Sequence, residues 1–206
     1  MELVNAIENR ASVRSFTAEK IKPEDLKELV RRAGLAPSIN NSQPWKFVVV
    51  TNHELLKKMA EAVSESIGNL PVKDKDDANR SFLSRIEWYS TFFEDAPALI
   101  ALLMKPYVSV LEKGVELSHE EIERMRNHPD MQTAGAAVQT ILLSAIDLGY
   151  GACWMSAPMI ARPALEKLLK VEDPWKLVTF VAVGKPFGAP ARKSKKALSE
   201  IIEIID

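Results

Sequence analysis

Apolar residues recur along the chain with two periods, which predict helices separated by short strands. A helix is predicted to begin at Pro23, because apolar residues follow at helical spacing at Leu26, Leu29, Val30 and Ala33. The same spacing predicts further helices over 2–9, 52–63, 82–93, 118–126, 132–148 and 163–169. Residues 132–148 are small and apolar on nearly every side, which is typical of a central, buried helix.

Short runs rich in β-branched and aromatic residues predict four strands, over 45–50, 98–104, 152–155 and 177–183. We expect these strands, including 45–50, to be buried. They fall at irregular intervals rather than in strict alternation with helices, which favours an α+β fold with a mixed sheet between helical layers. No flexible linker or internal repeat divides the 206 residues, so one domain over 1–206 is expected.

Two polar segments interrupt this pattern. Residues 68–79 carry few apolar side chains and are expected to form a mobile surface loop, while residues 106–129 form an acid-rich excursion with one short helix. Either segment is a candidate lid. The aromatic residues of 82–93 are interpreted as core or dimer interface in preference to a cofactor wall.

Charge and composition exclude several classes of function. The formal net charge is −1, so the chain has no overall field that attracts nucleic acid or anionic lipid. The first residues lack the basic start and apolar run of a signal peptide, and no apolar stretch is long enough to span a membrane, so a cytoplasmic protein is expected. Cys153 is the single cysteine, which excludes an internal disulfide.

Most familiar catalytic motifs are missing. There is no glycine-rich dinucleotide turn and no P-loop, so side chains must hold any nucleotide cofactor. The histidines are His53, His119 and His128, and their spacing does not predict a metal site, even where His119 is followed by three glutamates. Neither Cys153 nor any serine has the sequence context of a nucleophile. These absences favour redox chemistry that a bound cofactor performs.

Arg10, Ser12 and Arg14 form the most informative pattern in the chain. In an extended backbone these alternate side chains share one face and span about 13 Å, roughly the length of flavin mononucleotide, FMN. Two guanidinium groups and a hydroxyl on one face suit a phosphate at one end and a ring edge at the other. The alternative is a solvated turn after a short helix.

A second basic pattern lies near the carboxyl end, over residues 192–196, with the sequence Arg-Lys-Ser-Lys-Lys. Taken alone, it is compatible with a solvated tail or with a weak nucleic-acid contact. Because it follows a predicted buried strand and the turn Gly184-Lys185-Pro186, it is also a candidate for a second positive clamp on a phosphate.

Several segments together resemble the nitroreductase family of FMN-dependent oxidoreductases. They are residues 9–16 (NRASVRSF), 36–45 (APSINNSQPW), 136–139 (AAVQ), 148–154 (LGYGACW) and 183–186 (VGKP) with the basic tail. The resemblance implies a nitroreductase-like fold and an intertwined homodimer with two FMN sites at the subunit interface.

The resemblance also implies roles for particular residues. Arg10 and Ser12, with Ala11 between them, hold the FMN phosphate and ribityl chain, and Arg14 lies nearer the pyrimidine edge. Residues contributed by the partner subunit are Pro37, Ser38 and Asn40. The residues expected beside the flavin ring are Trp154, Met155, Ser156 and Ala157. The phosphate clamp is completed by Arg192 and by Lys195 or Lys196.

The function implied is hydride transfer from NADH or NADPH to FMN, followed by reduction of a nitroaromatic, quinone or related small acceptor in a ping-pong reaction. The flavin carries the chemistry, so no catalytic side chain is assigned. Two alternatives remain open: a specialised flavoenzyme of the same fold, such as a reductive dehalogenase or a flavin-fragmenting enzyme, and a flavin-binding protein without turnover. A nucleic-acid contact through the basic tail is a third.

Overall fold

The computed structural model describes residues 1–71, 77–190 and 193–205, except the side chains of 77–79. The helices are α1 (Leu3–Asn9), α2 (Pro23–Ala33), α3 (His53–Gly68), α4 (Asp77–Thr91), α5 (His119–Met125), α6 (Pro129–Asp147) and α7 (Arg162–Leu168). Single 3-10 turns are η1 (Ile39–Asn41), η2 (Phe92–Asp95), η3 (Leu111–Lys113), η4 (Ala157–Ala161) and η5 (Leu198–Glu200). The predicted helices are therefore all present, with ends shifted by a few residues.

Four strands form one sheet in the described part of the chain: β1 (Trp45–Val50), β2 (Ala98–Met104), β3 (Gly151–Met155) and β4 (Lys176–Gly184). Their order is β1-β2-β4-β3, and every neighbouring pair is antiparallel. A single parallel bridge between Ser12 and Ala152 adds the segment after α1 beside β3. The predicted α+β fold with a largely antiparallel, mixed sheet is confirmed.

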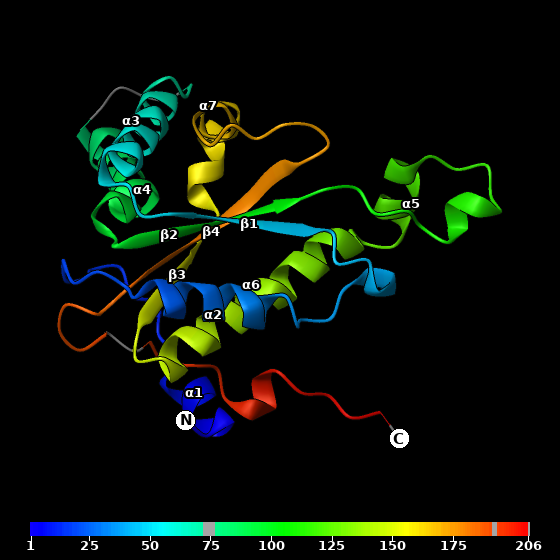
Figure 1. Ribbon diagram of the computed structural model, residues 1–206, viewed down its shortest axis with the longest axis horizontal. Coiled ribbons are helices and arrows are strands. Elements are labelled where there is room, and N and C mark those ends of the chain that lie inside the picture. Colours follow the sequence, from blue (N-terminus) through cyan, green and yellow to red (C-terminus); the bar gives the residue numbers. More distant parts are fainter. Residues whose placement is uncertain (72–76, 191–192, 206) are drawn as a thin grey trace.

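Helices cover both faces of the sheet. Figure 1 shows α2 and α6 on one face, with α1 beyond them, and α3, α4 and α7 on the other. Each face has its own apolar cluster: Met59, Phe93 and Phe180 belong to one, and Leu29, Ile141 and Val181 to the other. Phe180 and Val181 are neighbours in β4 and enter opposite clusters, because successive strand residues point to opposite faces. The central position predicted for 132–148 is confirmed by the buried residues of α6.

The expectation of a buried strand over 45–50 is wrong. β1 is one of the two edge strands of the sheet, and only its residue Val50 is buried, while Val49 is 36% exposed. The pattern of β-branched residues indicated a strand correctly but does not distinguish a central from an edge position. An edge strand has one neighbour instead of two, so part of its surface and one row of its backbone groups remain uncovered.

The aromatic run divides between two environments. Phe92 and Phe93 lie in η2 and are buried, as expected for core residues. Phe82, Trp88 and Tyr89 lie on α4 and are about half exposed, so they are not core residues of the single chain, and the alternative expectation of a dimer interface stays a prediction for them. The predicted loop over 68–79 is also shorter than expected, because α4 already begins at Asp77. Residues 72–76 lie outside the described part of the chain.

The excursion over 106–129 contains η3 and α5 and projects beyond the end of the sheet (Figure 1). Ser118 caps α5 in a capping box with Glu121, which fixes where the helix begins. None of the helices in the described residues is both long and apolar enough to cross a membrane.

Candidate flavin site

The segment that follows α1 is extended and lies against the edge of the sheet. Arg10 leaves the helix with extended backbone angles, φ −61° and ψ 123°. The Val13 amide donates to the Ala152 carbonyl at 3.1 Å, next to the parallel bridge from Ser12. The extended geometry predicted for Arg10, Ser12 and Arg14 is therefore present, held by β3.

The same segment is also held on its far side by the turn after β4. The Thr17 amide donates to the Lys185 carbonyl at 2.9 Å, and the Phe187 amide donates to the Ser15 carbonyl at 3.0 Å. These hydrogen bonds bring the chain that leads to the basic tail next to the arginine segment. The two ends of the chain consequently meet at one place.

A cavity of about 330 Å³ lies at this meeting point, and we refer to it as the cationic cavity. Its lining residues are Glu8, Arg10, Ala11, Ser12, Arg14, Lys193 and Lys195. Four cations therefore face one carboxylate. Within the described ranges, Arg10, Lys193 and Lys195 have no acidic ion-pair partner. Unpaired guanidinium and ammonium groups around a small cavity suit an anion such as a phosphate.

Arg14 links the cationic cavity to an aromatic surface. Its Nη1 donates to the Ser12 carbonyl at 3.4 Å, and its guanidinium lies 5.5 Å from the centre of the Tyr89 ring. A second cavity, of about 230 Å³, is lined by Arg14 together with Trp88, Tyr89 and the turn 186–190. The exposed aromatic side chains of α4 thus border the predicted site, although the sequence favoured a core or interface role for them.

β3 carries Trp154 at the position that the parallel bridge aligns with Arg14, but none of residues 154–157 lines the cationic cavity or the second cavity beside Trp88 and Tyr89. The Trp154 side chain is 48% exposed, and its Nε1 donates to the Thr179 hydroxyl at 2.8 Å. That hydroxyl donates in turn to the Met155 carbonyl at 2.9 Å. Met155 is buried, whereas Ser156 and Ala157 are exposed where β3 passes into η4.

Cys153 lies beside the arginine segment but is not an available nucleophile. Its side chain is buried, and burial raises the pKa of the thiol, while Arg14, the Ser12 hydroxyl and Arg10 only partly oppose the shift. A thiol with a raised pKa stays protonated near neutral pH and reacts poorly.

Not all of the predicted residues meet here. Ser38 accepts a hydrogen bond from the Gln43 amide at 3.0 Å in the loop around η1. Pro37, Ser38 and Asn40 line neither the cationic cavity nor the second cavity beside Trp88 and Tyr89. Arg192 lies outside the described residues, and Lys196 is exposed and does not line the cationic cavity.

The sequence did not single out three residues at this site. Lys193 stands in the basic run from which only Arg192 and Lys195 or Lys196 were chosen, and Tyr89 stands in the aromatic run. Glu8 lies on α1 and had no distinguishing pattern. Which member of a run reaches a cavity depends on the path of the backbone, which composition does not record.

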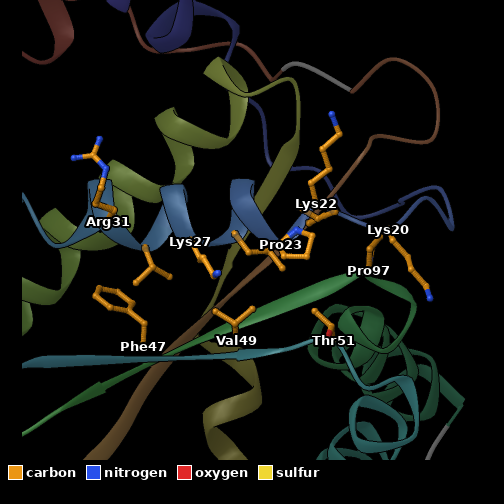
Figure 2. Close-up of a pocket in the computed structure, with 12 residues that line it drawn as sticks. Lys20, Lys22, Pro23, Lys27, Arg31, Phe47, Val49, Thr51 and Pro97 are labelled. Atoms are coloured by element: carbon orange, nitrogen blue, oxygen red, sulfur yellow. The ribbon is translucent and has the colours of Figure 1, made fainter.

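A larger cavity, of about 940 Å³, lies elsewhere, between α2 and the edge strand β1. Figure 2 shows Phe47 and Val49 of β1, and Thr51 just after the strand, facing Lys27 and Pro23 of α2 across it. Its lining contains cations and apolar groups but no carboxylate and no histidine, and it includes none of the residues predicted to bind flavin. It therefore lacks the carboxylate and histidine side chains that most often act as general acids and bases.

Comparison with known proteins places this geometry in a family. The model of the nitroreductase family matches residues 7–185. A relative from Archaeoglobus fulgidus, provisionally named NADH dehydrogenase/NAD(P)H nitroreductase, is 28% identical over 187 residues, covering 90% of this chain and 86% of the relative. An iodotyrosine deiodinase from Nematostella vectensis is 26% identical over 193 residues, covering 90% and 67% of the two chains.

Solved structures give the same result. A BluB-like flavoprotein from Clostridium difficile 630 is 31% identical, with a TM-score of 0.89 and full coverage of both chains. A nitroreductase with bound FMN from Desulfitobacterium hafniense shares the fold, at 22% identity and a TM-score of 0.73, covering 100% of this chain and 99% of the other. Since the family match spans most of the chain and the fold agrees along its whole length, this protein belongs to the nitroreductase family.

Proposed function

We propose that this protein is an FMN-dependent oxidoreductase that takes hydride from NADH or NADPH and reduces a small acceptor in a ping-pong reaction. The observation that carries the proposal is the cationic cavity, in which Arg10, Arg14, Lys193 and Lys195 surround a space with a single carboxylate. FMN, when bound, supplies the hydride acceptor and the two-electron chemistry that no side chain of this protein provides.

The residues of the cavity fit FMN along its length. Arg10, Lys193 and Lys195 would bind the phosphate as charge-assisted donors. Whether Arg192 also binds the phosphate is a question for mutagenesis. The Ser12 hydroxyl and the adjacent Ala11 backbone lie along the ribityl chain. Arg14 faces the pyrimidine edge, where a cation stabilises the negative charge that a reduced ring carries. Residues 154–157 would border the ring, as the family resemblance implies, with the Trp154 side chain held by Thr179.

The names of the relatives support the choice of substrates. NAD(P)H occurs in the name of the Archaeoglobus fulgidus relative, and FMN is bound in the Desulfitobacterium hafniense structure. Both substrates are expected to stack in turn on one open flavin face. Nitroaromatics and quinones are the acceptor classes we propose.

The proposed active unit is an intertwined homodimer. Two features of a single chain favour a second copy: the uncovered edge of β1, and a C-terminal arm whose residues 198–205 expose Leu198, Ile201, Ile202, Ile204 and Ile205. Figure 1 shows this arm running away from the sheet. Exposed apolar segments and open strand edges are normally covered by a partner. Pro37, Ser38 and Asn40 are proposed to reach the second copy's flavin.

A second candidate function is reductive dehalogenation, because several relatives are named iodotyrosine deiodinase. Flavin fragmentation and flavin binding without turnover remain further outcomes of the same test. Each of these uses the same cationic cavity and differs in what happens after the flavin is reduced.

Anaerobic mixing tests the proposal. The purified protein is expected to be yellow, with the mass of FMN, and to lose its absorbance with NADH or NADPH. Restoration of the colour by a nitroaromatic or a quinone supports the oxidoreductase, and restoration only by a halogenated phenol supports the dehalogenase. The main proposal is contradicted if the colour persists with both nicotinamides. It is also contradicted if the reduced flavin, on exposure to air, is broken down to a product that no longer has the mass of FMN.

A further inference from the structure

A buried carboxylate stands without a partner far from the cationic cavity. Glu123, on α5, is 5% exposed, and neither of its carboxylate oxygens has a hydrogen-bond partner in the described residues. The hydroxyl of Tyr107, which is 4% exposed, lies close enough to this carboxylate to shift its pKa, but within those residues it makes no hydrogen bond of good geometry. Burying a carboxylate without compensation is unfavourable, so such a group normally binds a proton, a cation or a donor.

The chain reverses direction immediately after α5 and brings two further ligating groups to Glu123. Asn127 and His128 both have positive φ, of 57° and 53°, and the His128 amide donates to the Glu123 carbonyl at 2.7 Å. Pro129 then begins α6, so that Asp130 lies in its first turn. The ligating atoms of Glu123, His128 and Asp130 all lie within 4.8 Å of one another.

Each of these side chains has a free ligating atom. Oδ1 of Asp130 accepts from the Met131 amide at 2.7 Å, which leaves Oδ2 for a ligand. No hydrogen bond or ion pair of the His128 ring is present in the described part of the chain. No lysine or arginine in that part pairs with Glu123.

We propose that Glu123, His128 and Asp130 bind a divalent transition-metal ion, of the class of Zn²⁺ or Mn²⁺. One imidazole nitrogen and two carboxylates suit these ions, whereas Mg²⁺ and Ca²⁺ prefer oxygen ligands alone. Two ligands of an ion bound at about 2.1 Å lie at most about 4.2 Å apart, close to the 4.8 Å limit that encloses the three ligating atoms here, and the exposed His128 side chain has room to adjust. The Tyr107 hydroxyl, which is not itself a ligand, lies close enough to the Glu123 carboxylate to donate a hydrogen bond to it.

The site has a structural consequence. A bound ion joins the end of α5 to the first turn of α6, and so fixes the excursion 106–129 to the helix that runs through the core. The residue spacing did not predict this grouping, because His128 follows Glu123 by five residues and meets it only through the reversal at Asn127.

The rival explanation is a proton shared between the two carboxyl groups. Burial raises the pKa of Glu123, and the neighbouring Asp130 shifts it in the same direction. A shared proton predicts no metal binding, and it predicts that Glu123→Gln keeps or raises the thermal stability of the metal-free protein.

Thermal unfolding of the full chain, dialysed against EDTA and then against buffer, tests the site with ZnCl₂ and MnCl₂, with MgCl₂ and CaCl₂ in parallel. We expect a saturable rise in Tm with Zn²⁺ or Mn²⁺, of about 5–10 °C at one hundred times Kd, and a smaller response to Mg²⁺ and Ca²⁺. Calorimetric titration is expected to give one ion per chain. The readout does not involve the flavin or activity, so it is independent of the proposed function.

Three variants make the test specific. Glu123→Gln and His128→Ala are each expected to weaken binding at least tenfold, and His53→Ala, which removes a histidine on α3, is expected to leave it unchanged. The proposal is overturned if no cation raises Tm, or if both site variants bind as the parent does. Should Glu123→Gln fail to fold, His128→Ala alone decides, because that side chain is exposed.

Discussion

Gly151 and Gly184 lie opposite each other where β3 and β4 pair, and each leaves room for a different segment of the chain. A Cβ added at Gly151 would lie 2.5 Å from Val13 Cγ2, and one added at Gly184 would lie 2.6 Å from Pro97 Cδ. The absence of a side chain at Gly151 therefore allows the arginine segment to approach the sheet edge.

Gly151→Ala is expected to displace Val13 and with it Ser12, which borders the cationic cavity. The expected cost is about 1–3 kcal/mol of unfolding free energy, as for other overpacked positions, together with weaker flavin binding. Denaturant unfolding and FMN titration of the apoprotein check both effects. Gly68→Ala, at a position with no atom within 4 Å of the added Cβ, is the matched control. Equal effects of the two substitutions would contradict this account.

Arg10→Ala is expected to weaken FMN binding by about 1.5–3 kcal/mol, the usual contribution of a hydrogen bond to a charged group. Lys195→Ala is expected to weaken it less, because the exposed lysine is a more mobile and better hydrated donor. Fluorescence quenching of free FMN measures both affinities. Arg31→Ala removes an arginine outside the cationic cavity and is expected to leave affinity unchanged. Full flavin occupancy in Arg10→Ala would remove this residue from the site.

Thr179→Val keeps the shape of a buried side chain but removes the hydroxyl that joins Trp154 to the Met155 carbonyl. The expected loss is about 1–3 kcal/mol of unfolding free energy, because the Trp154 N–H and the carbonyl both lose a partner. The exposed indole is also expected to change its fluorescence emission. Thr140→Val, which removes a hydroxyl bonded only within α6, is the control and should leave that emission unchanged.

The acid side of the stability profile should depend on Glu28. Hydrogen bonds from Arg31, which has the largest effect, and from Arg32 lower the pKa of Glu28 from 4.5 to about 2. A lowered folded-state pKa means that the pairing stabilises the protein above about pH 4.5 and that this contribution is lost as the pH falls toward 2. The Tm difference between the parent and Glu28→Gln should therefore shrink over that range, and 1 M salt should reduce it at every pH. A difference independent of pH would refute this role.

Removal of residues 198–206 is expected to convert the proposed homodimer to monomers while keeping Lys193 and Lys195. Light scattering coupled to size-exclusion chromatography measures the mass directly. Ile202→Glu and Ile205→Glu, made together, place charges on the apolar arm without shortening it and should have the same effect. An unchanged mass in both variants would show that the arm does not hold the second copy.

The sequence by itself determined the local elements and the family. Pro23 and the apolar spacing after it predicted α2, and the spacing over 52–63 predicted α3, whose first turn Asn52 caps by accepting from the Leu55 amide. Arg10, Ser12 and Arg14 indicated an extended cationic face. These features depend on residues within one turn or a few strand positions of each other, so a periodic pattern is enough to reveal them.

Only the tertiary structure decided which distant residues meet. Lys193 and Lys195 reach Arg10 because the order β1-β2-β4-β3 puts the end of β4 beside the segment after α1. The edge position of β1 and the contact of Arg14 with Tyr89 follow from the same arrangement. The hydrophobic periodicity of each strand is the same for any strand order, because an apolar side chain gains a similar free energy of burial against different neighbours. The packing of the whole chain selects one order, and with it the candidate site.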